Sequence, residues 1–455
     1  MYSDLKYLLC PLPEDIAKLK WSGDFARAKR VIDKRIAKGV PTALEKRLLL
    51  EKDILDRMPV QYPFSYEQAL EELKKAFADF QEEELEQLWE EDAAEWIFIE
   101  GKPYFKDDIV ANLVKTRPAL AKRVNNPSFL TDKEGNFSLL DETIAKMKKN
   151  GSLAYRIHVK NSLKVAPEFE KPGETLRVHL PIPVEYAQVK NFQLLNTSHT
   201  PKVVADSQYP NRTVYFEEKL KADEEFFVEY AFENHVRYVD PKPEDVADGQ
   251  PTFYTEEYAP QIVFTPYIRE LAAQIVGEEK NPLVKARKIY DFITTKVMYS
   301  FVRSYFTIPN IPEYGASGLK GDCGIQALLF ITLCRCCGVP ARWQSGLYAN
   351  PRSIGNHDWA QFYVAPYGWM FADCSFGGAA WREGALERWN FYFGNLEPFR
   401  IPACSDFQHE LYPAKKFLRN DPYDNQSGEA EYEDQGLRDV QLISEYKVVE
   451  AKEMD

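Results

Sequence analysis

The chain has 455 residues, which is too long for one hydrophobic core and predicts about three domains. Hydrophobic residues make up 45% and charged residues 28%, values typical of a globular protein, and no apolar run is long enough to span a bilayer. The net charge of −13 argues against nucleic acid as a partner. The N-terminus has no basic region followed by an apolar stretch, so as it stands the sequence predicts a cytoplasmic protein. A secreted or periplasmic protein would require a signal peptide that has been removed.

Residues 1–150 are predicted to form a mostly helical N-terminal domain. Pro13 opens one helix, and Ser65 precedes an amphipathic stretch whose apolar residues recur at helical spacing over 70–77. Residues 96–105 have the pattern of a short hairpin.

Residues 151–240 change to a period of two, which is typical of strands. Five alternating segments are separated by clusters of Pro, Gly, Asn and Asp: 153–159, 175–182, 189–195, 213–217 and 226–232. Short strands with such turns predict a small β-sandwich or barrel. A proline-stiffened acidic stretch at 240–245 then leads into a third predicted domain, residues 241–408.

A helix is predicted over 323–337, because Asp322 is a capping residue and Gly338 with Pro340 is a stop signal. Cys323 would lie in its first turn. Free N–H groups and the helix dipole favour a thiolate there, and a thiolate is the nucleophilic form of cysteine.

A hairpin is predicted over 357–376, with its turn at 366–368. If its two apolar faces coincide, His357 and Asp373 lie on the same side, directly opposite or one diagonal apart. Asp358 then points away from the imidazole, and Cys374 belongs to the core. A carboxylate beside an imidazole fixes its tautomer, as a general base requires.

With these elements in place, the chain resembles the transglutaminase-like superfamily, a branch of the papain-type cysteine enzymes, and in particular its bacterial multidomain members. The matching segments are 321–324 (GDCG), 333–335 (LCR), 338–342 (GVPAR), 345–346 (SG), 357–359 (HDW) and 368–369 (GW) leading to Asp373. The resemblance implies that Cys323 is the nucleophile, His357 the general base and Asp373 its orienter. It also implies an α+β fold in which the nucleophile helix packs on an antiparallel sheet.

The oxyanion site departs from the papain-type pattern. The glutamine expected six residues before the nucleophile is replaced by Ser317, and residues 282–320 contain no tryptophan. The backbone N–H of Cys323 with a side chain such as Tyr299 is the alternative.

Cys334, Cys336 and Cys337 form a cluster, but no second ligand pair accompanies them, so the sequence predicts neither a metal nor a cofactor. The odd count of seven cysteines favours reduced thiols over a disulfide framework.

These features predict a thiol-dependent hydrolase of peptide or amide bonds, acting through a Cys–His–Asp triad and a thioester on a peptide or protein substrate. Two alternatives remain open. One is acyl transfer from a glutaminyl side chain to an amine, and the other is a non-catalytic scaffold with a vestigial site. The sequence makes no prediction of oligomeric state.

Residues 409–455 form a predicted acidic C-terminal tail. Eleven acidic and three basic side chains lie between 421 and 455, and residues 421–437 have almost no aliphatic residues, which predicts a mobile or loosely docked segment. Alternation resumes over 439–449, which predicts a strand added to an edge of the β-domain.

Overall fold

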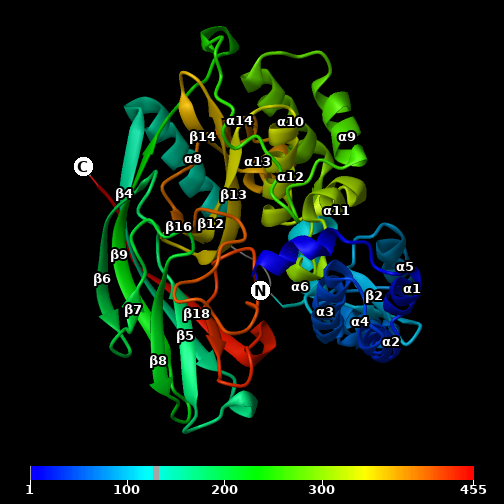
Figure 1. Cartoon of the computed structure of the whole chain (residues 1–455). Helices are drawn as coiled ribbons and strands as arrows, with labels where there is room; N and C mark the ends of the chain where they lie inside the picture. The colour runs from blue at the N-terminus through cyan, green and yellow to red at the C-terminus, as the bar shows by residue number, and fades with distance from the viewer. Residues whose placement is uncertain (1, 127–132, 455) are drawn as a thin grey trace.

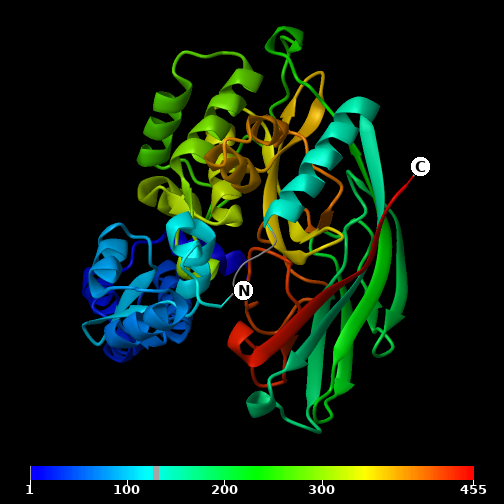
Figure 2. The same cartoon turned by 180° about the vertical axis from the view of Figure 1, so that it is seen from behind.

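The computed structural model describes residues 2–126 and 133–454 and has a mixed α+β fold. Figures 1 and 2 show a helical region at one side, a β-sandwich at the other, and a helix-and-sheet core above and between them. No helix in the described ranges combines the length and the hydrophobicity needed to cross a bilayer. The predicted limits at residues 150, 240 and 408 stay a prediction.

The N-terminal region is mostly helical, as its periodicity predicted. Ser65 caps one helix reciprocally with Gln68, and Asp24 caps another. The hairpin predicted at 96–105 is present. The elements are α1 (Glu14–Trp21), α2 (Phe25–Ala37), α3 (Thr42–Arg57), β1 (Phe64–Ser65), α4 (Tyr66–Ala76), α5 (Glu82–Glu90), β2 (Trp96–Ile99), β3 (Lys102–Phe105), α6 (Ile109–Thr116), α7 (Pro118–Ala121) and α8 (Lys133–Asn150).

Two four-stranded sheets form the sandwich, in the orders β18-β4-β9-β6 and β17-β5-β8-β7. Their inward residues, such as Ile157, Val178 and Phe232, are completely buried. All five segments predicted from alternation are strands. The bounds are β4 (Ser152–Val165), β5 (Thr175–Pro181), β6 (Val189–Thr197), β7 (Val203–Val204), β8 (Thr213–Lys219), β9 (Phe226–Arg237), β17 (Glu429–Glu431) and β18 (Leu442–Glu453).

The C-terminal residues confirm one prediction and correct another. The strand expected at 439–449 is β18, which adds antiparallel to the edge strand β4. Residues 421–437 are not a mobile segment, because Tyr423, Tyr432 and Leu437 are buried and β17 pairs with β5. The prediction from composition was wrong because buried cations neutralise the acidic side chains. Aromatic residues also provide the buried apolar surface that aliphatic residues usually provide.

The core has a five-stranded antiparallel sheet, in the order β15-β14-β13-β12-β16, with helices on one face. Helix α12, which begins at Cys323, packs on it, with Phe330 of α12 against Phe362 of β13 at 5.8 Å between ring centroids. The bounds are α9 (Pro266–Val276), α10 (Pro282–Lys296), β10 (Met298–Tyr299), α11 (Ile311–Gly318), β11 (Lys320–Gly321), α12 (Cys323–Cys336), β12 (Ala341–Ala349), β13 (Ile354–Val364), β14 (Gly368–Ala372), α13 (Cys374–Arg382), α14 (Leu386–Phe391), β15 (Phe393–Gly394) and β16 (Arg400–Cys404).

The second strand of the predicted hairpin is shorter than expected. It ends at Ala372, and Asp373 caps α13 by accepting the N–H of Phe376 at 2.9 Å. Aspartate is a strong N-cap residue, and this local hydrogen bond outweighs the alternation that continued past it. Cys374 is buried as predicted, but in a helix.

Candidate active site

Cys323 is the first residue of α12, the position predicted for it. Asp322 caps the helix by accepting the N–H of Ile325 at 3.2 Å, and the hydroxyl of Tyr305 donates to Asp322 at 2.5 Å. Cys323 is a free, half-buried thiol. The next residue must be small, because a Cβ on Gly324 would lie 2.2 Å from the Tyr305 hydroxyl.

His357 and Asp373 are in direct contact. Gln361 of β13 pairs with Phe371 of β14, so the predicted polar faces of these two strands lie on the same side of the sheet. The His357 Nε2 atom lies 2.7 Å from Asp373 Oδ2, which leaves Nδ1 as the nitrogen that can act as a base. The structure therefore brings together these two members of the predicted group.

A buried arginine holds the same carboxylate. Arg400 Nη1 lies 2.8 Å from Asp373 Oδ2, and Arg400 also pairs with both oxygens of Glu397, at 2.7 and 3.1 Å. Asp373, Arg400 and Glu397 are all 0% exposed. Sequence reasoning missed Arg400, which comes from another strand and carries no local motif.

The charges around this pair determine its protonation. Burial alone would raise the pKa of Asp373, but the neighbouring His357 and Arg400 lower it below its ordinary value, so the carboxylate is ionised. Burial lowers the pKa of His357 and outweighs the attraction of Asp373. The imidazole is therefore neutral at neutral pH, as a general base must be.

The thiol contacts a different side chain. Cys323 Sγ donates to Asp358 Oδ2 at 3.3 Å, and within the described residues no hydrogen bond joins Cys323 to His357. Successive strand residues point to opposite faces. His357 shares its face with Gln361, which accepts a hydrogen bond from Tyr186 of the sandwich side, while Asp358 shares its face with Phe362, which packs on α12.

Strand β13 has an open edge beside His357 and Asp358. Pairing of β13 with β14 begins at Ala360–Ala372, so the β14 side of His357 and Asp358 has no paired strand residue in the described register. The charge of Lys115 lowers the pKa of both Cys323 and His357.

In the described conformation the thiol is neutral. Burial raises the pKa of Cys323 well above its ordinary value, and the charges of Asp358 and Asp322 raise it further. Burial also raises the pKa values of Asp358 and Asp424, and the charge of Asp424 raises that of Asp358 further. This thiol is not the reactive thiolate that its helix position alone predicted.

Asp358 is thus a residue near Cys323 that sequence reasoning did not identify. It does point away from the imidazole, as predicted. However, the apolar residues that follow it on the same face pack against the nucleophile helix, and that pattern could have placed Asp358 at the helix start.

Two further side chains lie around the thiol, one of them through the other. The Tyr299 hydroxyl lies next to Cys323, as the oxyanion hypothesis required. Burial and the proximity of Cys323 raise the pKa of Tyr299. Lys115 of α6 donates to the Tyr299 hydroxyl at 3.2 Å, so the helical region contributes to the site. Among the described residues no cluster of three or more metal-ligating side chains is found.

Comparison with known families fits this geometry. The family model of the transglutaminase-like superfamily matches residues 269–374, which include Cys323, His357 and Asp373. The chain carries a transglutaminase-like domain. The resemblance inferred from the motifs is confirmed over that range.

Similar proteins add little about activity. An uncharacterized protein of Haemophilus influenzae is 26% identical over 249 residues, covering 46% of this chain and 65% of the relative, slightly less than two thirds of its length. Among solved structures, a Cytophaga hutchinsonii protein described as a "Putative Cysteine Protease" aligns with a TM-score of 0.40 and 15% identity, over 67% of this chain and 91% of that one. The periplasmic domain of TgpA from Pseudomonas aeruginosa aligns with a TM-score of 0.28 and 15% identity, over 55% and 94%.

Proposed function

We propose that this transglutaminase-like protein is a thiol-dependent hydrolase of peptide or amide bonds, with Cys323 as nucleophile, His357 as general base and Asp373 as its orienter. The observation that carries the proposal is the buried His357–Asp373 contact at 2.7 Å with Arg400 on the same oxygen. Burying an ionised carboxylate and a guanidinium costs desolvation energy, and such arrangements concentrate at functional sites.

The reaction begins when the thiol leaves Asp358 and gives its proton to Nδ1 of His357. The ionised Asp373 stabilises the imidazolium that forms. The thiolate attacks the carbonyl carbon, and the oxyanion is held by the Cys323 N–H and the Tyr299 hydroxyl. His357 then protonates the leaving amine, and water hydrolyses the thioester.

Arg400 is a positioning residue in this scheme. Its charge keeps Asp373 ionised, and its two bonds to Glu397 fix the guanidinium. We also propose that residues 241–408 are the catalytic unit, to which the helical region adds Lys115.

A non-catalytic binding protein is the second candidate, because the Cys323 thiol donates a hydrogen bond to the Asp358 carboxylate and, within the described residues, none to the His357 imidazole. In that case the domain would bind a peptide and leave it intact.

A peptide library with mass-spectrometric detection tests the proposal. The wild-type protein is expected to yield water-cleaved fragments, and Cys323→Ala to yield almost none. Cys336→Ala, a half-buried thiol at the other end of the same helix, is the matched control and should keep full activity. Amine adducts in place of fragments would indicate acyl transfer. The proposal fails if no product forms, or if Cys323→Ala forms product at the wild-type rate.

A further inference from the structure

A loop from the C-terminal part of the chain reaches the nucleophile's partner. We call residues 424–428 the cover loop. Gln426 Nε2 donates to Asp358 Oδ1 at 2.6 Å, while the other oxygen of that carboxylate accepts from Cys323. Beside it, Ser427 Oγ accepts from Asn356, the neighbour of His357, at 3.4 Å. The loop therefore touches the strand that carries both the base and the thiol's partner.

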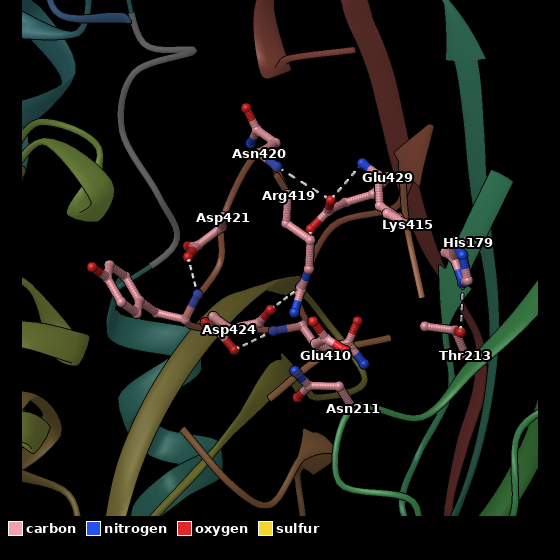
Figure 3. Close-up of polar contacts among 12 residues, drawn as sticks. His179, Asn211, Thr213, Glu410, Lys415, Arg419, Asn420, Asp421, Asp424 and Glu429 are labelled. Carbon is pink, nitrogen blue, oxygen red and sulfur yellow. Dashed lines mark hydrogen bonds and ion pairs between the residues drawn. The ribbon is translucent and has the colours of Figure 1, made fainter. Parts of the chain in front are cut away.

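The base of the cover loop is pinned by buried ion pairs (Figure 3). Arg419 Nε lies 2.6 Å from Glu429 Oε1, and Lys415 Nζ lies 2.9 Å from Glu429 Oε2. The Arg419 guanidinium also donates to the carbonyl oxygen of Asp424. These contacts link residues that precede the cover loop to residues at its start and just after its end. Both ends of the loop are therefore fixed.

Both flanks of the loop are also packed tightly. Asn425 Nδ2 donates to the carbonyl oxygens of Arg212 and Ala403, at 3.1 and 2.9 Å. A Cβ on Gly428 would lie 2.8 Å from the Cδ2 methyl of Leu180 of the sandwich, so a larger residue here would have to displace that side chain.

The tip differs from the base. Gln426 and Ser427 are half-buried, whereas Asp424, Asn425 and Glu429 are buried. The tip contacts the site through two hydrogen bonds, one from Gln426 to Asp358 and one from Asn356 to Ser427. Water can replace both of these polar contacts. Tyr446 of β18 contacts the tip from the sandwich side, at 2.9 Å from Ser427 Oγ. The tip can therefore lift while the base stays anchored.

We propose that the cover loop is an autoinhibitory lid, in which Gln426 fixes the Asp358 carboxylate so that it retains the Cys323 thiol away from His357. The inference rests on the proposed function, since it describes the regulation of that site. Lifting of the tip releases one oxygen of Asp358, and the thiol becomes free to turn around the open edge of β13. A substrate that displaces the Gln426 side chain would do the same.

Peptide-resolved alkylation of Cys323 by iodoacetamide tests the lid in the full-length protein. In Gln426→Ala the alkylation rate at pH 7.5 is expected to rise about three- to tenfold, the factor that corresponds to one net intramolecular hydrogen bond. Gln435→Ala, the same residue type farther along the segment, should leave the rate unchanged.

The wild-type protein offers a second test that needs no variant. Amide hydrogens at 426–427 are expected to exchange faster than those at 429–431, because the tip opens without unpairing β17. Equal protection across 424–431 would overturn the lid.

The outcomes separate the lid from the hydrolase. Faster alkylation of Gln426→Ala without any peptide cleavage supports the lid and refutes the hydrolase. Unchanged or slower alkylation in a protein that cleaves peptides refutes the lid and leaves the hydrolase standing.

Discussion

Replacing Asp358 with asparagine should make Cys323 more reactive. The change removes a negative charge 3.3 Å from Sγ but keeps the shape of the side chain and an oxygen that can accept from Gln426. With an effective dielectric constant of about 20, a full charge at that distance is worth ~5 kcal/mol, so its removal should lower the pKa of Cys323. Because burial and Asp424 raise the pKa of Asp358, its carboxyl does not carry the full charge, and we expect only part of this effect.

A lower pKa raises the thiolate fraction at pH 7.5, while the lower basicity makes each thiolate less nucleophilic and offsets roughly half of that gain on a logarithmic scale. Alkylation of Cys323 by iodoacetamide should therefore be about tenfold faster in Asp358→Asn. Asp248→Asn, an exposed acid in the linker, is the matched control and should alkylate at the wild-type rate. An unchanged or slower rate in Asp358→Asn, with the fold intact by circular dichroism, would refute the assignment of Asp358 as the group that retains the thiol.

Three further predictions follow from the same geometry. Asp373→Asn should lower kcat for peptide cleavage by about 10²–10⁴-fold, by analogy with triads that lose their orienting carboxylate, and undiminished turnover would show that His357 needs no orienter. Arg400→Met should lower the free energy of unfolding by about 3–5 kcal/mol in urea titrations, because it leaves Asp373 and Glu397 buried without their cation, and a change below about 1 kcal/mol would contradict that pairing. Since burial raises the pKa of Cys323, alkylation of the wild-type thiol should keep rising with pH beyond the ordinary value near 9.0, whereas a plateau between pH 5 and 8 would indicate a thiolate–imidazolium pair.

Much of the fold follows from local patterns in the sequence. The nucleophile helix was predicted at 323–337 and extends over Cys323–Cys336, because its cap and its stop signal are both local. The five sandwich strands and the terminal strand β18 were likewise predictable, since alternation is a direct consequence of one buried face. The register that pairs His357 with Asp373 followed from matching two apolar faces.

The parts that failed depend on contacts between distant segments. Residues 421–437 had the composition of a mobile tail, yet Glu429 is neutralised by Lys415 and Arg419 inside the protein. No sequence motif indicates that the side chain of Gln426 contacts Asp358, 68 residues earlier in the chain. Arg400 was missed for the same reason.

Covalent trapping of the acyl-enzyme tests the central claim most directly. A peptide that the protein cleaves would be mixed with it, the reaction quenched in acid within milliseconds to seconds, and the digest searched by mass spectrometry for an acyl group on the peptide that contains Cys323. We predict a thioester on Cys323 in the wild-type protein and its absence in His357→Ala. Peptide cleavage without any acylation of Cys323, at a rate unchanged by Cys323→Ala, would contradict the account.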